Sequence, residues 1–424
     1  MKYAVITFGC KVNQYESGAI DNAMLAAGHT VCSEDEIPDV VIVNSCSVTE
    51  NGDKKARHAV RAAKRQGAVA VLTGCYPQAF PEEAAKCGAD IIAGTARRSE
   101  IPALIDSFVS GQGAKADMTL PKRYEELPLP GSPARTRAFI KIEDGCDRYC
   151  SYCVIPYARG RVRSRSVDSV AEEARLCAAA GHREAVLVGI NLSRYGSDIG
   201  CDLADAVRAA SAPVGIVRVR LSSLEPELLD ERLISRLAEN EKLCPHFHLS
   251  LQSGCDATLK RMNRRYDTAE YMNIVHRLRE KFPGCAVTTD IMVGFAGESD
   301  EEFAQSLDFA AKAGFARIHV FTYSIRPGTA AEKRSDHVPD AVKEQRYAQM
   351  SALAARVNGD FLRSQTGTEA VVLVQKRTSP DFAAGLTPNY TPVRIYGSDA
   401  RKHDLVRVRI TGAEEGFCTG ECVD

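Results

Sequence analysis

Six short apolar runs between residues 138 and 323, separated by stretches with helical periodicity, constrain the fold more than any other feature. The runs lie at 138–142, 185–189, 216–221, 247–251, 286–293 and 317–323. Strands that alternate with helices predict a parallel sheet. Six such units predict a partial (βα)6 barrel, similar to part of a TIM barrel, whose chemistry lies at the carboxyl ends of its strands. We expect its first helix over 167–180 and its last over 341–363.

Three cysteines follow the first of these runs in the spacing C-x-x-x-C-x-x-C: Cys146, Cys150 and Cys153. Their odd number and short spacing argue against a disulfide framework and point to a metal. A structural zinc site needs four ligands, and no fourth Cys or His lies nearby in the sequence. Three thiolates on a 4Fe-4S cluster leave one iron open to a substrate or cofactor. We therefore favour an open iron-sulfur cluster, with zinc or structural thiols as the alternative.

This spacing, with Tyr152 just before the last cysteine, resembles the radical S-adenosylmethionine (SAM) superfamily. In that family the open iron holds the amino and carboxylate groups of SAM, and an electron from the cluster cleaves SAM to a 5′-deoxyadenosyl radical. The resemblance implies catalytic roles for the three cysteines. It also implies that one residue of the cysteine loop and several residues on or just after the later strands contact SAM or substrate: Tyr152, Gly189, Asn191, Ser223, Gln252 and Asp290. A turn or helix cap is the alternative role for each polar residue.

The first hundred residues repeat the alternation of strand and helix. Apolar runs at 3–8, 39–43 and 68–72, with a further candidate at 90–93, predict a parallel sheet. The first three runs are followed by Cys10, Cys46 and Cys75 respectively. Ligands of open parallel sheets gather at the carboxyl ends of the strands, so the three thiols are predicted to share one rim. This pattern favours a second cluster site over three separately buried cysteines.

The segments around these cysteines resemble the amino-terminal domain of the methylthiotransferases, which are radical SAM enzymes with an auxiliary cluster. The matching segments are TFGCKVNQYES (7–17), VNSCSVTENGDKKAR (43–57) and LTGCYPQ (72–78). Residues 11–14 are most like the branch acting on threonylcarbamoyladenosine at position 37 of tRNA (t6A37), whereas the other branches usually show other residues there. The resemblance implies a second 4Fe-4S cluster on Cys10, Cys46 and Cys75, with SAM as the second type of cofactor. It also implies the tRNA anticodon stem-loop as substrate, and flavodoxin or ferredoxin as electron donor to a monomeric enzyme.

The rest of the chain divides into a linker and a small carboxyl-terminal domain. We expect an α/β domain at 1–117, a linker at 118–134 and the radical SAM barrel at 135–365. From 366 to 424, short strands parted by turn residues predict a small antiparallel barrel. The expected strands lie at 369–375, 391–396, 405–410 and 416–423. This domain resembles the RNA-binding TRAM module, although its seven Lys/Arg and eight Asp/Glu give it no net positive charge, which an RNA-binding domain usually has.

Two local clusters of positive charge stand out in a chain whose net charge is −1. Residues 53–65 carry six Lys/Arg against one Asp on a predicted helix, which is either a solvated face or an RNA phosphate contact. The second cluster has eight cationic residues against Glu143, Asp144 and Asp147, a balance of +5: Arg135, Arg137, Lys141, Arg148, Arg159, Arg161, Arg163 and Arg165. We expect it to steer RNA to the edge of the open iron. Pairing of these arginines with carboxylates inside the fold is the alternative.

Composition points to the cytoplasm and to metal chemistry. No run of 18 or more apolar residues and no signal-peptide pattern occurs, so we expect a cytoplasmic protein with no membrane partner. Fifteen cysteines in a reducing compartment favour ligation or catalysis over disulfides. The sequence predicts a t6A37 tRNA methylthiotransferase. The alternatives are a methylthiotransferase acting on isopentenyladenosine or on a ribosomal protein, and a non-catalytic zinc-dependent RNA-binding protein.

Overall fold

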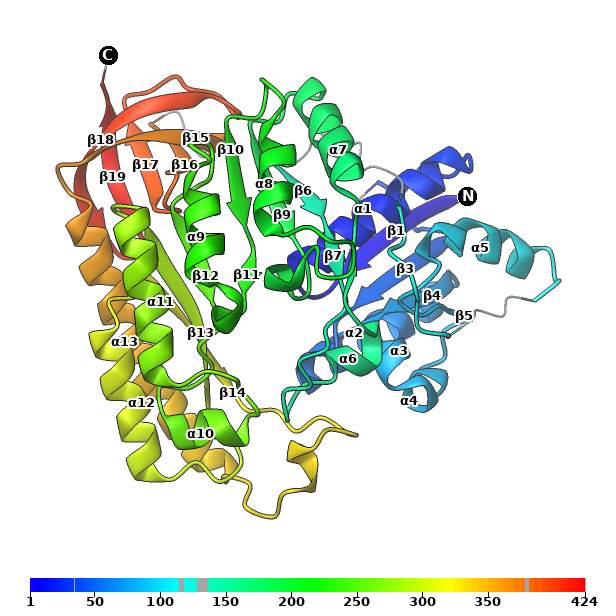
Figure 1. The fold of residues 1–424 in the computed structure, drawn as a ribbon. Coiled ribbons are helices and arrows are strands. Elements are labelled where there is room, and N and C mark those ends of the chain that lie inside the picture. The colour runs from blue at the N-terminus through cyan, green and yellow to red at the C-terminus, as the bar shows by residue number, and fades with distance from the viewer. Residues whose placement is uncertain (34, 114–117, 128–135, 378–380, 424) are drawn as a thin grey trace.

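The computed structural model describes residues 1–33, 35–113, 118–127, 136–377 and 381–423, and shows three packed parts (Figure 1). An α/β sheet carries the amino terminus, a partial barrel forms the centre, and a small closed barrel carries the carboxyl terminus. None of the described helices is long and apolar enough to cross a membrane.

The amino-terminal part is a parallel five-stranded sheet in the order β2-β1-β3-β4-β5, as the sequence predicts. Its strands are β1 (Lys2–Thr7), β2 (Thr30–Val31), β3 (Val40–Ser45), β4 (Val69–Gly74) and β5 (Ile91–Ile92). Its helices are α1 (Lys11–Ala26), α2 (Glu50–Arg65), α3 (Cys75–Ala79), α4 (Pro81–Ala85), the 3-10 helix η1 (Arg98–Glu100) and α5 (Ile101–Val109). Apolar side chains of α1 and α5 cover one face, and those of α2, α3 and α4 cover the other. The sheet is therefore buried on both sides, as parallel sheets require.

The central part is a partial barrel built from parallel strands. Its main strands are β6 (Arg137–Lys141), β9 (Glu184–Val188), β10 (Arg218–Leu221), β12 (His246–Leu249), β13 (Ala286–Val293) and β14 (Arg317–Thr322). They form the sheets β10-β9-β6 and β11-β12-β13-β14, where β11 is Ser223–Leu224, and the parallel bridge between Val219 and Leu243 links the two. The six predicted runs are thus six parallel strands. The barrel is open between β6 and β14, where the amino-terminal part lies (Figure 1).

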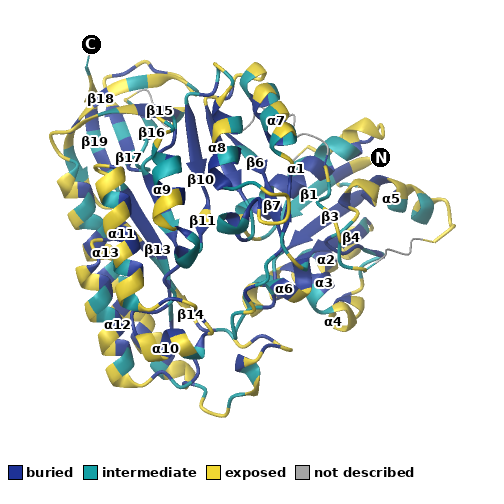
Figure 2. Cartoon of the chain, in the orientation of Figure 1, coloured by how far each residue is buried: buried dark blue, intermediate teal, exposed yellow. Residues whose placement is uncertain are grey.

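Helices cover the outside of this barrel and leave its polar loops at one end. They are α6 (Ile155–Arg159), α7 (Val167–Ala179), η2 (Leu192–Arg194), α8 (Leu203–Ser211), η3 (Pro226–Leu228), α9 (Glu231–Ala238), α10 (Asp256–Arg261), α11 (Thr268–Lys281), α12 (Asp300–Lys312), η4 (Ala331–Lys333) and α13 (Asp340–Ser364). Residues of these helices and of the strands form one apolar core, which Figure 2 shows as buried strands inside half-exposed helices. Asp267 and Ser299 cap α11 and α12 with complete capping boxes, so local sequence fixes where both helices begin.

The carboxyl-terminal part is a closed barrel of five strands in the order β15-β16-β17-β19-β18. Its strands are β15 (Glu369–Arg377), β16 (Phe382–Leu386), β17 (Pro392–Tyr396), β18 (Leu405–Glu414) and β19 (Phe417–Cys422). The prediction of a barrel is confirmed, but β16 was missed and the barrel is not fully antiparallel, because β17 pairs with β19 in parallel. The FAAGL sequence of β16 lacks the β-branched residues that mark strands.

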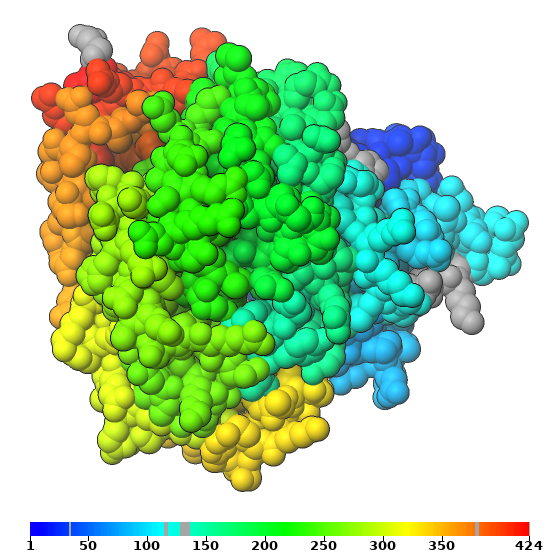
Figure 3. Space-filling view, viewed as in Figure 1, coloured from blue at the N-terminus to red at the C-terminus, as the bar shows by residue number. Residues whose placement is uncertain are grey.

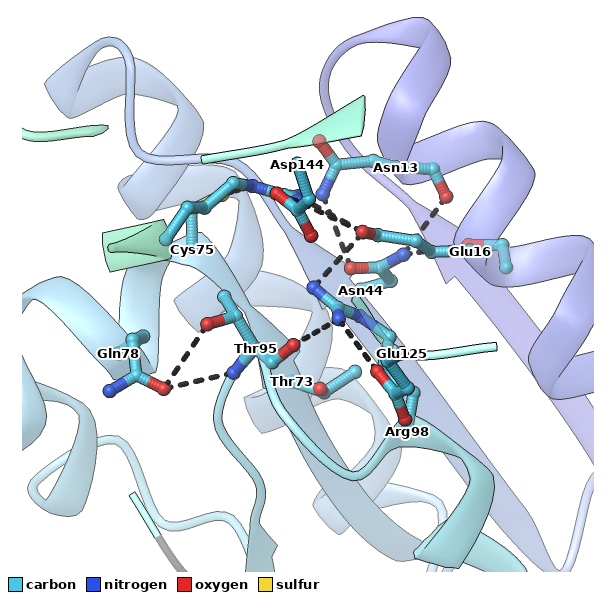
Figure 4. Close-up of polar contacts among 12 residues, drawn as sticks. Asn13, Glu16, Asn44, Thr73, Cys75, Gln78, Thr95, Arg98, Glu125 and Asp144 are labelled. Carbon is cyan, nitrogen blue, oxygen red and sulfur yellow. Dashed lines mark hydrogen bonds and ion pairs between the residues drawn. The ribbon is translucent and has the colours of Figure 1, made fainter. Parts of the chain in front are cut away.

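A buried ion network joins the amino-terminal part to the barrel (Figure 4). The Glu16 carboxylate on α1 accepts hydrogen bonds from Arg159 at 2.7 and 3.0 Å and from Lys141 of β6 at 2.8 Å. Arg98 pairs with the same carboxylate at 3.1 Å, and Asp144 accepts from Arg159 at 3.0 Å. All five side chains are buried. Two carboxylates are thus shared by three cations drawn from both parts of the chain.

Electrostatics at Glu16 show how strongly the network depends on ionisation. Burial alone would raise the pKa of Glu16, but attraction from Arg159, Arg98 and Lys141 outweighs it and lowers the pKa to about 2, from an ordinary value of 4.5. Because the folded-state pKa is the lower one, this stabilisation is complete above pH 4.5 and is lost as the pH falls toward 2.

Replacing Glu16 with Gln should lower the free energy of unfolding by about 3–5 kcal/mol, because it removes one of the two buried carboxylates on which these buried cations depend. Urea unfolding of the full chain at pH 7 measures this loss. Glu172→Gln is the matched control, since it breaks the exposed Glu172–Arg175 pair and should cost less than about 1 kcal/mol. Equal losses for the two variants would show that the network does not hold the parts together.

Candidate active site and cluster sites

The loop that carries Cys146, Cys150 and Cys153 is closed at its base by backbone pairing. β7 (Glu143–Asp144) pairs antiparallel with β8 (Arg163–Ser164), and the Cys146 N–H donates to the Gly160 carbonyl at 2.9 Å. Gly145 adopts φ +89° and lies against the backbone of Arg161, so a side chain there would clash. The loop follows β6, at the carboxyl end where the sequence predicts the chemistry.

Side-chain hydrogen-bond donors lie beside two of the three sulfurs of this loop. Arg264 Nη1 lies 3.3 Å from Cys150 Sγ, and Asn191 Nδ2 lies 3.6 Å from Cys146 Sγ. Burial raises the pKa of the Cys146 thiol to about 12, and it raises that of Cys153 further, with repulsion from Cys150 adding to both shifts. The thiols are therefore close enough to interact, and their ionisation requires positive charge nearby.

The amino-terminal cysteines lie at neighbouring strand ends. Cys10 caps α1 after β1, Cys46 follows β3, and Cys75 begins α3 after β4. A Cβ atom on Gly9 would lie 2.6 Å from Cys46 Cβ, which shows how closely the first two segments approach. Burial, with contributions from Cys75 and Cys10, raises the pKa of Cys46 to about 12. The three thiols thus share one rim, as predicted.

Both groups of cysteines fit iron-sulfur ligation by their chemistry. All fifteen cysteines are free, and Arg159 Nε lies 3.2 Å from Cys75 Sγ, a donor that suits a thiolate ligand. Within the described ranges, no group of three or more His, Cys, Asp or Glu side chains is arranged to hold a single metal ion. A 4Fe-4S cluster binds each thiolate at a different iron, so its three sulfurs do not need to converge on one point.

The two groups of cysteines lie near an interface between the two parts of the chain. Helix α3, which begins at Cys75, packs against α6, which begins two residues after Cys153. The Thr95 hydroxyl donates to the Ala158 carbonyl at 2.7 Å across the same interface. Arg326, after β14, pairs with Asp53 of α2 and donates to the Ser47 hydroxyl at 3.1 Å, next to Cys46. Figure 3 shows the two parts packed along their length.

A cavity opens where these loops meet and brings together three of the predicted contact residues. Tyr152, Gln252 and Asp290 line it together with Cys153. The other lining residues are Val48, Thr49, Val154, Ile155, Met292, Phe321, Thr322, Tyr323, Ser324 and Arg326. Gln252 has φ +69° and exchanges backbone hydrogen bonds with Asp290 and Met292, which fixes its position beside β13. The cavity is thus shared by both parts of the chain.

The remaining predicted contact residues lie elsewhere. Asn191 is buried beside Cys146, while Gly189 packs against the Glu143 carboxylate, which accepts from the Asn191 N–H at 2.7 Å. Burial raises the pKa of that carboxyl to about 8. Ser223 is exposed at the start of β11 and is not among the described residues that line the cavity.

The prediction that the arginine-rich loop steers RNA is wrong for most of its residues. Five of the eight cationic residues are buried: Lys141, Arg148, Arg159, Arg163 and Arg165. Lys141 and Arg159 both pair with Glu16 and Asp144, and Arg163 pairs with Asp144. Arg148 pairs with Glu227, and Arg165 pairs with Glu173 and Glu126. Arg161 is exposed, and Arg135 lies outside the described residues. The loop therefore serves the fold, because carboxylates from distant segments reach it.

The basic face of α2, in contrast, stays on the surface. Lys54, Lys55, Arg61, Lys64 and Arg65 are exposed, and α2 begins one residue after Thr49 at the cavity. Lys54 pairs with Glu50, and Lys64 pairs with Asp90. The role of this face, solvated or RNA-binding, stays a prediction.

Sequence reasoning missed the residues that donate hydrogen bonds to sulfur. Arg264 lies between two helices in a segment without a motif, and its guanidinium also pairs with Glu225. Arg159 was read as part of a surface charge cluster, yet it joins Cys75 to Glu16. No periodicity or spacing marks either residue, because both contacts join segments that are distant in the sequence.

Comparison with known proteins agrees with the fold described above. Residues 140–310 match the model of the radical SAM superfamily, and residues 2–94 match an uncharacterized protein family, UPF0004. Among solved structures, the radical SAM methyltransferase TsrM from Kitasatospora setae aligns with a TM-score of 0.57 at 16% identity, covering 78% of this chain and 74% of that one. The radical SAM enzyme OxsB aligns with a TM-score of 0.55 at 11% identity, covering 83% of this chain and 56% of the OxsB chain. These structures share the fold.

Relatives of known name cover nearly the whole chain. The threonylcarbamoyladenosine tRNA methylthiotransferase MtaB of Thermotoga maritima is 35% identical over 99% of this chain and 97% of its own length. MtaB of Bacillus subtilis is also 35% identical, over 98% of this chain and 95% of its own length. The tRNA-2-methylthio-N(6)-dimethylallyladenosine synthase of Pelotomaculum thermopropionicum is 32% identical over 99% of this chain and 97% of its own. Together with the two cysteine loops, this similarity shows that the chain belongs to the methylthiotransferase family of radical SAM enzymes.

Proposed function

We propose that this enzyme adds a methylthio group to carbon 2 of N6-threonylcarbamoyladenosine at position 37 of tRNA. The observation that carries the proposal is a cavity lined by both parts of the chain, with Cys153 on one side and with Val48 and Thr49, which closely follow Cys46, on the other. The relatives with the highest printed identity act, by name, on this nucleoside. Residue 37 lies in the anticodon loop, where an unpaired base can be splayed into a pocket without melting a duplex.

The proposed cofactors are SAM and two 4Fe-4S clusters, held by Cys146, Cys150 and Cys153 and by Cys10, Cys46 and Cys75. When bound, they supply the radical and sulfur-transfer chemistry that an aromatic C–H bond requires. The chain itself holds and orients these groups. Arg264, Asn191 and Arg159 donate toward the sulfurs and stabilise their negative charge. Phe321 is 47% exposed at the cavity and offers a ring on which a base can stack.

We assign SAM or substrate contacts to Tyr152, Gln252 and Asp290 in the cavity, and supporting roles to Gly189 and Asn191 beside Cys146. The electron donor is a small flavin or iron-sulfur protein, and the enzyme acts as a cytoplasmic monomer. The domain boundaries proposed are 1–117, 135–365 and 366–424.

A second candidate substrate is isopentenyladenosine in tRNA. The relatives named as dimethylallyladenosine synthases are 32–33% identical over nearly the whole chain, close to the values of the first group. The modified nucleoside that the enzyme produces separates the two candidates.

Iron content should be about eight atoms per chain after anaerobic reconstitution, since each site holds four irons. Replacing Cys10, Cys46 and Cys75 with Ala should halve this number, while dithionite-driven cleavage of SAM to 5′-deoxyadenosine continues. Replacing Cys32, Cys201 and Cys422 with Ala is the matched control, because these three free thiols are also at least partly exposed but belong to neither group of proposed ligands, so the iron content should not change. Zinc with little iron in the wild-type chain would refute the cluster assignment.

Deleting the gene should remove the 2-methylthio derivative of threonylcarbamoyladenosine from bulk tRNA and leave its unmethylthiolated precursor in its place. Mass spectrometry of nucleosides measures both species. The wild-type gene should restore the product, and a Cys150→Ala gene should not, because one ligand of the SAM-binding cluster is lost. Loss of the isopentenyl derivative instead would establish the second candidate, and an unchanged nucleoside profile would sink both.

A further inference from the structure

A groove lies beside the loop of Cys146, Cys150 and Cys153, apart from the cavity that holds Gln252 and Asp290. Its volume is about 800 Å³, within the range of sites that hold small organic ligands. The residues 120–124, the cysteine loop with β8, and the residues 198–199 line it. No described residue lines both this groove and the cavity. The groove is therefore a separate surface beside the same loop.

Two tyrosines expose their rings at this groove and next to it. Tyr149 lines the groove and is 47% exposed, and Tyr157 of α6 is 52% exposed. The two rings pack edge to face with centroids 6.0 Å apart, so each supports the position of the other. Ile199 adds an exposed apolar side chain to the groove. Aromatic side chains stabilise a fold by being buried, so the fold alone does not account for this exposed pair.

The cysteine loop holds Tyr149 in a backbone conformation that bulky residues rarely adopt. Its φ is +49°, in the left-handed region. The Asn263 side chain, just after α10, donates to the Tyr149 carbonyl at 2.9 Å, and the Ser151 N–H donates to the Met262 carbonyl at 3.0 Å. Glycine or asparagine would adopt this backbone at a lower cost. A tyrosine at this position therefore points to a role for its ring.

The groove also carries positive charge on its surface. Lys122, Arg123 and Arg161 line it and are exposed. Within the described ranges, no ion pair involves these three side chains, in contrast to the buried arginines of the same loop. Asp198 is the one carboxylate among the described residues of the lining, and it accepts from the Ser164 N–H at 2.9 Å. The excess of exposed positive charge attracts a polyanion.

The cysteine loop contributes neighbouring residues to the groove and to the cavity. Tyr149 lines the groove and Tyr152 lines the cavity, while Ile155 lines the cavity and Pro156 lines the groove. The backbone from Tyr149 to Tyr152 spans at most about 11 Å, even when it is extended. An RNA strand that places one base in the cavity can therefore place a neighbouring nucleotide in the groove.

We propose that this groove binds the unpaired nucleotides next to the target adenosine in the tRNA anticodon loop. A base stacks on Tyr149, and Lys122, Arg123 and Arg161 bind the flanking phosphates. The inference rests on the proposed function and adds the path of the RNA strand outside the cavity. Aromatic rings set among cations along a groove are the features by which proteins hold single-stranded nucleic acids. They match the alternation of base and phosphate along the strand.

The test measures the binding of labelled RNAs to the reconstituted full-length enzyme by fluorescence anisotropy. The RNAs are the anticodon stem-loop with t6A37, the same stem-loop with unmodified A37, and the stem as a duplex without the loop. Tyr149→Ala should weaken the binding of both stem-loops about 10-fold or more, because the stacking of one base is lost. The affinity for the duplex should not change. Tyr149→Phe keeps the ring and should bind the stem-loops like the wild type.

Replacing Lys122, Arg123 and Arg161 together with Gln should lower the salt dependence of stem-loop binding. Each lost phosphate contact should reduce the slope of log affinity against log salt concentration by about 0.7, the value for a single strand. Tyr347→Ala and Arg277→Gln are the matched controls. Tyr347 of α13 is 44% exposed and Arg277 of α11 is exposed, and both lie outside the described lining of the groove. Both controls should keep the wild-type affinity and salt dependence.

Iron content, with SAM binding by equilibrium dialysis, shows whether the cysteine loop stays intact, because Tyr149 directly precedes Cys150. If Tyr149→Ala loses iron, Tyr157→Ala takes its place. That variant should weaken stem-loop binding about threefold or more, since it removes the edge-to-face support of the Tyr149 ring.

The failures are distinguishable. A wild-type enzyme that binds neither stem-loop more tightly than the duplex, with nucleosides unchanged by gene deletion, refutes the proposed function itself. Wild-type binding of the stem-loops that persists in the tyrosine and triple variants overturns the groove alone. Equal weakening for stem-loop and duplex overturns it as well, because the groove would then contact the stem. SAM cleavage that slows with reduced flavodoxin but not with dithionite, at unchanged RNA affinity, would assign the groove to the electron donor instead.

Discussion

The buried carboxylate of Glu16 makes the contacts on which the relative placement of the two groups of cysteines depends. It pairs with Arg159, Lys141 and Arg98, which come from α6, from β6 and from η1. Arg159 also donates to Cys75 and lies six residues after Cys153. One guanidinium therefore touches the amino-terminal cysteine rim and belongs to the loop of the other cysteines. Since both contacts are buried, water does not screen them, and the geometry between the loops is held by charge.

Buried charge also determines the surroundings of the sulfurs. A thiol that must ionise in a buried place needs positive charge or N–H donors, because burial alone raises its pKa. Arg264 at Cys150 and Arg159 at Cys75 supply such donors, and Glu225 and Glu16 orient the two guanidinium groups. Each arginine is thus fixed by a carboxylate from another segment. Thiols surrounded in this way match what is expected of cluster sites, where outer contacts tune charge and orientation.

Sequence alone was enough for the elements whose signal is local. The six barrel strands and the parallel amino-terminal sheet were predicted because apolar β-branched runs recur between helical stretches. The rim of Cys10, Cys46 and Cys75 followed from the rule that parallel strands end on one side. Strand β16 was missed because FAAGL is a weak strand sequence, and it forms through pairing with β15 and β17. Its burial depends on neighbours that no local pattern reveals.

Charge was the property that sequence reasoning handled least well, because a cluster of like charges in the sequence does not identify its partners. Arg159 is separated from Glu16 by 143 residues, and Arg148 pairs with Glu227. Once these pairs form, the arginine-rich loop contributes Arg161 to the surface, and the exposed basic face beside the cavity is that of α2.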